Sequence, residues 1–260
     1  MQGSKWVAAT RIGFAARGIM YMLIGWLALR SGRAEDGPGI LAYLASGAGR
    51  LLLAAMAVGF LAYGAWRLTD AWTDGSGRGA DAKGVAIRAG GAVSGLVHLG
   101  LGVVAAVLAA GSRGGAGAGG GDAPREGAQT ALSLPGGPLL LLLAAAALMA
   151  TGLFQLKKAW SLDFMADLDR GRGRGDWVCW LGRAGYSARG IVFAMMGWFL
   201  LRAGVEHRSS EAGGLGEALA SLPATPQIAV AAGLLLFGLF SLVEARYRRI
   251  HRPRPLAELR

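Results

Sequence analysis

The segment Arg11–Gly18 near the N-terminus reads RIGFAARG, and two later segments follow the same pattern without a gap. The second reads RAGGAVSG at 88–95, and the third reads RAGYSARG at 183–190. In all three, another glycine follows 14 residues after the opening arginine. Internal repetition of this kind indicates that one supersecondary unit occurs three times along the chain.

A second motif closes each unit. It reads GAWRLTDA at 64–71, GLFQLKKA at 152–159 and GLFSLVEA at 238–245. Each unit therefore contains an opening segment and a closing segment, and both are rich in apolar residues. We predict one membrane domain over 1–260 that contains repeats at 6–75, 84–165 and 178–250 and ends in a basic tail at 246–260.

The composition is typical of a membrane protein. Of the 260 residues, 53% are hydrophobic and 17% are charged, whereas a soluble domain has about 25% charged residues. A bilayer core about 30 Å thick needs roughly 20 apolar residues in each spanning helix. Six segments meet this requirement, at about 12–30, 50–70, 88–110, 138–158, 183–203 and 226–246. The predicted fold class is all-α integral membrane, with six transmembrane helices that form three helical hairpins.

The quoted motifs resemble those of a family of bacterial six-helix membrane proteins with a domain of unknown function, DUF 1206. The family pattern is Arg-x-Gly-aromatic-x-x-Arg-Gly, followed by an apolar helix and then a second helix that ends near an acidic residue and alanine. The first and third repeats match this pattern, whereas the second has Gly91 for the aromatic residue and Ser94 for the second arginine. The resemblance implies a fold and a membrane location, and it implies no activity.

Positive charge is divided unequally between the two sides of the predicted bundle. If the first helix starts on side one, 20 of the 27 Lys and Arg fall on that side and 7 on the other. Because cytoplasmic loops carry the excess of Lys and Arg, both termini are predicted to be cytoplasmic, in the cell membrane of a bacterium. Each hairpin then starts and ends in the cytoplasm, so the three are parallel repeats, for which a pseudo-threefold arrangement is expected.

This bias accounts for the net charge of +11 without a nucleic-acid partner. The basic tail is expected to lie near anionic lipid headgroups, and binding to nucleic acid or a regulator is the alternative.

Glycines recur on one face of the first helix of each repeat: Gly18, Gly25, Gly95, Gly102, Gly190 and Gly197. On a membrane helix, glycine allows neighbouring backbones to approach closely. We interpret this face as a helix-packing surface. The alternative is that the small residues open a narrow axial passage.

Arg17 and Arg189 are candidate polar sites within the membrane, because each lies about 9 Å inside the arginine at the helix mouth. An intramembrane charge is unfavourable unless it is paired or hydrated. The repeats offer a partner, since the first has Arg17 with Asp70, the third has Arg189 with Glu244, and the second lacks both the arginine and the acid. We predict two structural ion pairs, and a role in handling anions or protons is the alternative.

His98 lies at the helical level of Tyr21 in the first repeat, and Ser94 lies at the level of Arg17. A hydrogen-bonded core histidine is expected, and a proton or ion site on an axial path is the alternative. The sequence shows no catalytic triad, no paired intramembrane carboxylates and no metal-ligand cluster. No enzymatic activity, cofactor or metal is therefore predicted.

Two function classes follow from the pattern. Parallel repeats around an axis, with buried Arg and His, favour a transporter or channel for a small solute or ion. Charge pairs that satisfy each other favour a non-catalytic membrane scaffold or accessory subunit. A protein partner is left open and unidentified.

Overall fold

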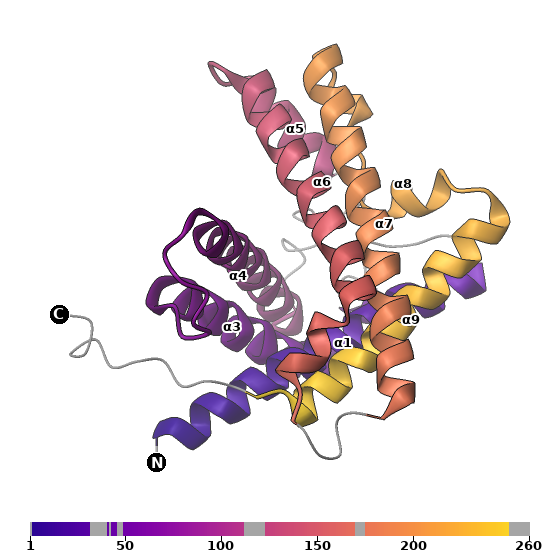
Figure 1. Cartoon of the computed structure of the whole chain (residues 1–260). Coiled ribbons are helices and arrows are strands. Elements are labelled where there is room, and N and C mark those ends of the chain that lie inside the picture. The colour runs from indigo at the N-terminus through magenta and orange to yellow at the C-terminus, as the bar shows by residue number, and fades with distance from the viewer. Residues whose placement is uncertain are drawn as a thin grey trace.

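The computed structural model describes residues 2–31, 41, 43–45, 49–111, 123–169 and 175–249, and within these ranges the chain is helical without a β-strand (Figure 1). The six long helices are α1 (Gln2–Ser31), α3 (Arg50–Thr73), α4 (Ala82–Ala109), α6 (Gly137–Ser161), α7 (Asp176–Glu206) and α9 (Ala224–Tyr247). All six are long and apolar enough to cross a membrane, which confirms the predicted six-helix fold class. Short helices with described bounds lie between them: α5 (Ala123–Leu132), η2 (Asp163–Asp167), η3 (Ser209–Glu211) and α8 (Leu215–Ala220).

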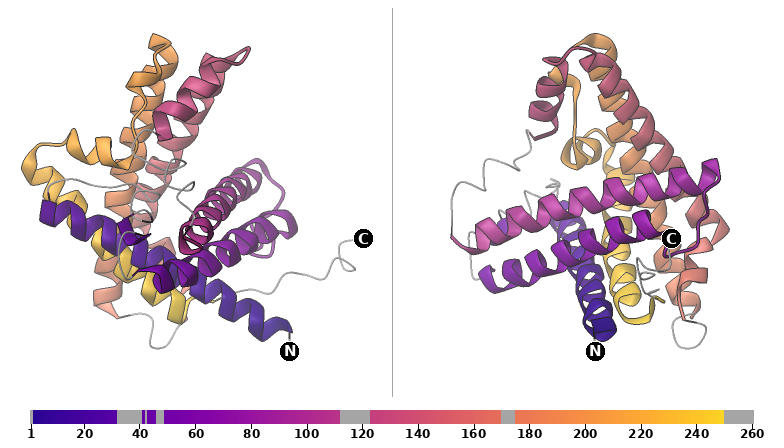
Figure 2. Two further views of the ribbon diagram at one scale, coloured as in Figure 1. Left: turned by 180° about the vertical axis from the view of Figure 1, so that it is seen from behind. Right: turned by 90° about the vertical axis from the view of Figure 1, so that its left-hand side faces the viewer.

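The long helices pack as three pairs, α3 with α4, α6 with α7, and α1 with α9, as both views in Figure 2 show. The first two pairs join the closing helix of one repeat to the opening helix of the next. The third pair joins the last long helix of the chain to the first. The closest helix contacts therefore form between repeats, and each pair combines one closing helix with one opening helix.

Two facing glycines form the crossing point of each pair: Gly18 and Gly238, Gly95 and Gly64, and Gly190 and Gly152. A Cβ atom added to Gly18 would lie 2.8 Å from the carbonyl oxygen of Gly238, and the corresponding distances in the other two pairs are 3.0 and 2.9 Å. Side chains do not fit between backbones this close. Van der Waals contact between helices drives their association in lipid, so glycine at these positions allows the tightest packing.

The second glycine of each opening helix also faces its partner helix. A Cβ on Gly25 would lie 2.6 Å from the carbonyl oxygen of Ala231, and a Cβ on Gly197 would lie 3.0 Å from that of Ala145. A Cβ on Gly102 would lie 3.0 Å from the backbone nitrogen of Leu61. All six glycines selected from the sequence therefore lie at helix–helix contacts.

Contacts within the repeats are less uniform. In the first repeat α1 also packs on α3, and in the third α7 packs on α9. Between α4 and α6 of the second repeat, the described residues form no comparable interface. As a result α1 and α9 lie at the centre of the molecule, and α4 and α6 lie at its edge.

The short segments gather at opposite ends of the molecule. At one end the chain after α9 pairs with the chain after η2, because the N–H of Asp169 donates to the carbonyl of Tyr247 (2.9 Å) and that of Arg249 donates to the carbonyl of Asp167 (3.0 Å). At the other end α5 packs near η3 and α6, and Arg125 forms an ion pair with Glu217 of α8 at 3.4 Å. Segments that the topology assigns to one side thus lie together.

Candidate functional site

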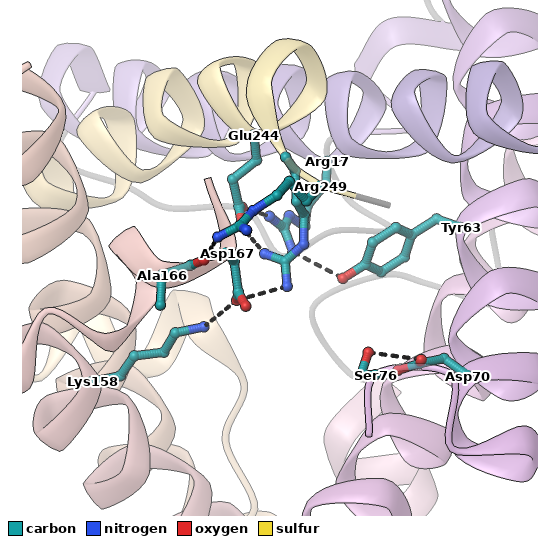
Figure 3. Close-up of polar contacts among 10 residues, drawn as sticks. Arg17, Tyr63, Asp70, Ser76, Lys158, Ala166, Asp167, Glu244 and Arg249 are labelled. Carbon is teal, nitrogen blue, oxygen red and sulfur yellow. Dashed lines mark hydrogen bonds and ion pairs between the residues drawn. The ribbon is translucent and has the colours of Figure 1, made fainter. Parts of the chain in front are cut away.

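Arg17 of α1 lies at the centre of a buried polar cluster where three helices meet (Figure 3). Its guanidinium forms an ion pair with Glu244 of α9, which is also buried. The Nη1 group donates a hydrogen bond to the hydroxyl of Tyr63 on α3, at 2.9 Å. The charge is thereby compensated by a carboxylate and a phenol from different helices.

Glu244 has a second cationic partner, Arg248, which follows it by one helical turn. The Nη2 group of Arg248 donates to Oδ2 of Asp167 at 2.9 Å, and Nζ of Lys158 lies 3.8 Å from the same oxygen. We call the set Arg17, Glu244, Arg248, Asp167 and Lys158 the charged hub. It contains three cations and two carboxylates, so its formal charge is positive.

Two members of the charged hub lie outside the spanning helices, and their ionisation is coupled. Burial works to raise the pKa of the Asp167 carboxyl, but the positive charges of Arg248, then Lys158 and Arg78, hold that pKa below its usual value. Burial works to lower the pKa of the Arg248 guanidinium, but Glu244 and Asp167 raise it. Both groups are therefore held in their charged forms.

Aromatic rings surround the guanidinium of Arg17. Its carbon lies 4.8 Å from the ring centroid of Phe14, 5.2 Å from that of Phe237 and 5.4 Å from that of Tyr63. Cation–π attraction to desolvated rings adds about 2 kcal/mol in favourable cases. The rings also exclude lipid and water from the ion pair.

Arg189 of α7 has only the aromatic part of this environment. Its guanidinium carbon lies 4.4 Å from the ring of Phe237, 5.0 Å from that of Phe193 and 5.1 Å from that of Tyr21. Tyr21 is buried and packs its ring edge to face with Phe237, at 4.9 Å. Among the residues that the structure describes, no carboxylate pairs with Arg189, and its buried Nε has no hydrogen-bond partner.

The predicted ion pairs were wrong in their partners. Arg17 pairs with Glu244 rather than with Asp70, and Glu244 is therefore not the partner of Arg189. The physical reason is that the tight helix pairs form between repeats. Each tight helix pair has two matched positions. The first lies directly before the crossing glycine of the opening helix, and the second lies six residues after the crossing glycine of the closing helix. These matched positions hold Arg17 and Glu244, Ser94 and Asp70, and Arg189 and Lys158.

Asp70 has a different local role. Its Oδ1 accepts a hydrogen bond from the hydroxyl of Ser76 at 2.7 Å (Figure 3). A small cavity of about 100 Å³ opens beside it, lined by Trp66, Asp70, Ser76, Arg78, Asp167, Arg248 and Arg249. The cavity adjoins the charged hub, at the end where η2 meets the chain after α9.

His98 of α4 is joined to the Arg17 cluster through Tyr63. Its ring centroid lies 4.6 Å from that of Tyr63, and its Nδ1 lies 2.7 Å from the carbonyl oxygen of Ser94. Its Nε2 is buried and has no hydrogen-bond partner in the described part of the chain. Five polar residues were selected from the sequence. Arg17, Arg189, His98 and Tyr21 thus contribute side chains to the region around Tyr63 and Phe237, and Ser94 contributes a carbonyl.

Tyr63, Arg248, Asp167 and Lys158 were not selected from the sequence as site residues. The spacing of Arg248, four residues after Glu244, was a usable signal, since such residues are neighbours on a helix surface. Asp167 lies in a charged segment between α6 and α7, and only the three-dimensional contacts show its role. Candidate metal-binding groups of three or more acidic, His or Cys side chains do not occur among the described residues.

Comparisons with known proteins agree with the repeat architecture. The chain matches the family described as Domain of Unknown Function (DUF1206) over residues 12–74, 89–161 and 184–248, one match for each repeat. It is 28% identical over 253 residues to a Bacillus subtilis (strain 168) protein described as uncharacterized protein YxxB, and the alignment covers 92% of this chain and 90% of the relative. No solved structure matches. Three matched segments and six membrane-spanning helices lead to one conclusion: the chain is a multi-pass membrane protein of the DUF1206 family.

Proposed function

We propose that this protein binds a small anion within the membrane and moves it across the bilayer. The observation that carries the proposal is Arg189, a cation in a spanning helix for which the described residues provide no carboxylate. An unpaired charge at this depth is unfavourable by at least a few kcal/mol, so intramembrane cations usually serve binding or transport. An anion that replaces the missing carboxylate would supply the compensating charge.

The surroundings of Arg189 support the choice of an anion. The charged hub has one more cation than carboxylates. Arg67 adds a further buried Nε without a hydrogen-bond partner among the described residues. Fixed positive charges in a low-dielectric site attract anions much more strongly than they do in water. A proton alone would be repelled by the same charges, so the arrangement favours an anion as the transported species.

The proposal includes a location and an orientation. We place the protein in the bacterial cell membrane with both termini in the cytoplasm. The bias of 20 to 7 in Lys and Arg supports this orientation. The pairing of the chain after α9 with the chain after η2 supports placing those two segments on one side.

Thiol labelling of intact cells tests the orientation. In a Cys179→Ser background, the exposed residues Lys83 and Ser133 would each be replaced by cysteine. An impermeant reagent should label Ser133→Cys and leave Lys83→Cys unlabelled until the cells are opened. The reverse pattern would overturn the orientation.

Anion flux into reconstituted vesicles tests the transport. Chloride, nitrate and phosphate would be compared in vesicles that contain the wild-type protein, Arg189→Gln or the control Arg183→Gln. Arg183 lies on the same helix, and its Nε donates to the carbonyl of Ala159 at 3.4 Å. Flux should be lost in Arg189→Gln and kept in Arg183→Gln. Absence of wild-type flux for all three anions, or unchanged flux in Arg189→Gln, would overturn the proposal.

A scaffold or accessory subunit is the second candidate. It is favoured by the charged hub, because Glu244 and Asp167 connect Arg17, Arg248 and Lys158 into one network of ion pairs. A stable protein partner after mild solubilisation, together with an absence of flux, would support it. Neither candidate assigns a catalytic reaction to the chain.

A further inference from the structure

The three repeats place corresponding residues in very different surroundings. In the first repeat a Cβ on Gly13 would lie 2.5 Å from the Cβ of Tyr63, so α1 and α3 are in close contact. In the third repeat a Cβ on Gly185 would lie 2.6 Å from the Cα of Phe237. The corresponding glycine of the second repeat, Gly90, has nothing within 4 Å of such an atom.

The lack of a contacting helix on this face of α4 extends beyond Gly90. Val93 is 62% exposed, whereas its counterparts Ala16 and Ala188 are 3% and 4% exposed. One turn further, Val97 is 56% exposed, whereas its counterparts Met20 and Val192 are buried. On α6 the corresponding residues Ala147 and Thr151 are exposed as well. We call Gly90, Val93, Val97, Ala147 and Thr151 the second-repeat seam.

Side-chain size explains why this seam does not close. In the first repeat a Cβ on Gly59 would lie 2.8 Å from the Cβ of Ala16, and in the third a Cβ on Gly233 would lie 2.5 Å from that of Ala188. The second repeat has an alanine, Ala147, at the glycine position and the larger Val93 opposite it. The contact that joins the helices in the other repeats is therefore sterically blocked.

A cation lies beside the second-repeat seam. The first and third repeats have an aromatic residue after the seam glycine, and the second has Gly91 instead. The guanidinium carbon of Arg67 lies 3.8 Å from a Cβ built on Gly91, so the small residue leaves room for this side chain. The described residues provide no carboxylate for Arg67, and its buried Nε lacks a hydrogen-bond partner. Arg67 lies about two turns from the end of α3, and a long arginine side chain at such a position can extend toward the headgroups.

We propose that the second-repeat seam binds an anionic phospholipid, with one acyl chain along Val93, Val97 and Ala147 and the headgroup phosphate on Arg67. The seam is apolar where an acyl chain packs, and Arg67 lies toward the end where the headgroup lies. Guanidinium groups bind phosphate oxygens with two parallel hydrogen bonds, which gives the site preference for phosphate. Charge complementarity favours phosphatidylglycerol over a zwitterionic lipid. This site does not depend on anion transport, because it requires only that the protein lie in a bilayer.

Native mass spectrometry of the purified full-length protein tests the site. The protein would be titrated with phosphatidylglycerol or phosphatidylcholine in mild detergent, and bound lipid would be counted. Wild type should retain one phosphatidylglycerol molecule preferentially. Arg67→Gln should weaken that binding about tenfold, because a charged hydrogen bond is lost. Arg50→Gln, an exposed arginine at the opposite end of α3, is the control and should bind as wild type does.

A second variant tests the acyl-chain part without changing charge. Gly90→Leu fills the seam, and it should lower retention of phosphatidylglycerol. Gly100→Leu is the matched control, because Gly100 lies on the same helix and also has nothing within 4 Å of an added Cβ. Both variants should melt as wild type does.

Three results would overturn the lipid site. Equal retention of the two lipids by wild type would exclude headgroup recognition. Unchanged binding in both Arg67→Gln and Gly90→Leu would exclude the seam. A rapid disulfide between Gly90→Cys and Thr151→Cys in a Cys179→Ser background, in bilayers that contain phosphatidylglycerol, would show that α4 and α6 close on each other instead.

Discussion

Arg17 and Arg189 occupy the same position in two repeats, yet their surroundings differ. Arg17 has the carboxylate of Glu244, the hydroxyl of Tyr63 and three aromatic rings. Arg189 also has three rings, but the part of the chain described by the structure offers it no carboxylate. The difference arises from the paired helix, because the position that holds Glu244 on α9 holds Lys158 on α6, the helix that pairs with α7. A residue's role in this fold is therefore set by the adjacent repeat more than by its own.

The largest expected effect comes from removing Glu244, which compensates two arginines. Glu244→Gln leaves Arg17 and Arg248 without this carboxylate, and breaking a buried pair typically destabilises by about 3–5 kcal/mol. We expect a corresponding drop in melting temperature of the detergent-purified protein. Asp70→Asn is the control, because Asp70 bonds to Ser76 rather than to Arg17.

A double-variant cycle sharpens the same point. Arg17→Ala and Glu244→Ala should each destabilise, and the double variant should lose less than the sum of the two. Additive losses would show that the two side chains do not stabilise each other.

The next effect concerns the crossing glycines. Gly18→Leu and Gly190→Leu should each destabilise by roughly 1–3 kcal/mol or more, because a side chain has no space between the paired backbones. Gly90→Ala should cause no loss, since an added Cβ meets nothing within 4 Å. Melting temperatures would be measured in one detergent. Equal tolerance at all three positions would contradict the tight pairing between repeats.

A smaller effect is expected at Arg189. Arg189→Met removes cation–π contacts of about 1–2 kcal/mol but also relieves the burial of an unpaired charge, so the two contributions oppose each other. We expect a change within about 1 kcal/mol, well below that of Arg17→Met. A loss equal to that of Arg17→Met would mean that Arg189 has an anionic partner in the folded protein.

The smallest effect is a pH dependence from Asp167. Its pKa in the folded protein is held below its usual value, so its contribution to stability is complete above about pH 4, the usual carboxyl pKa. The contribution is lost as the pH falls from there through the folded-state pKa. The difference in melting temperature between wild type and Asp167→Asn should therefore shrink as the solution is acidified. A difference that grows on acidification would contradict this ionisation.

Sequence patterns predicted the elements of the fold but not their pairing. The six spans and three repeats follow from local hydropathy and from ungapped motifs such as Arg11–Gly18. The pairing of the helices does not follow from these patterns, because a repeated glycine face fits the neighbouring helix on either side equally well. For that reason Arg17 was correctly selected as a candidate, but its partner was sought in the wrong repeat. Tyr63 gave no signal, since an aromatic residue in a spanning helix usually indicates packing.

The pairing of α1 with α9 has a consequence for biosynthesis. Arg17 and Glu244 are separated by 227 positions, so α1 enters the membrane long before its counter-charge is made. Contacts between distant segments form late and slow the folding of a chain. Throughout synthesis the nascent chain therefore carries an uncompensated arginine in its first helix, and only the last helix neutralises it. Any chain that terminates before α9 therefore lacks the carboxylate that pairs with Arg17.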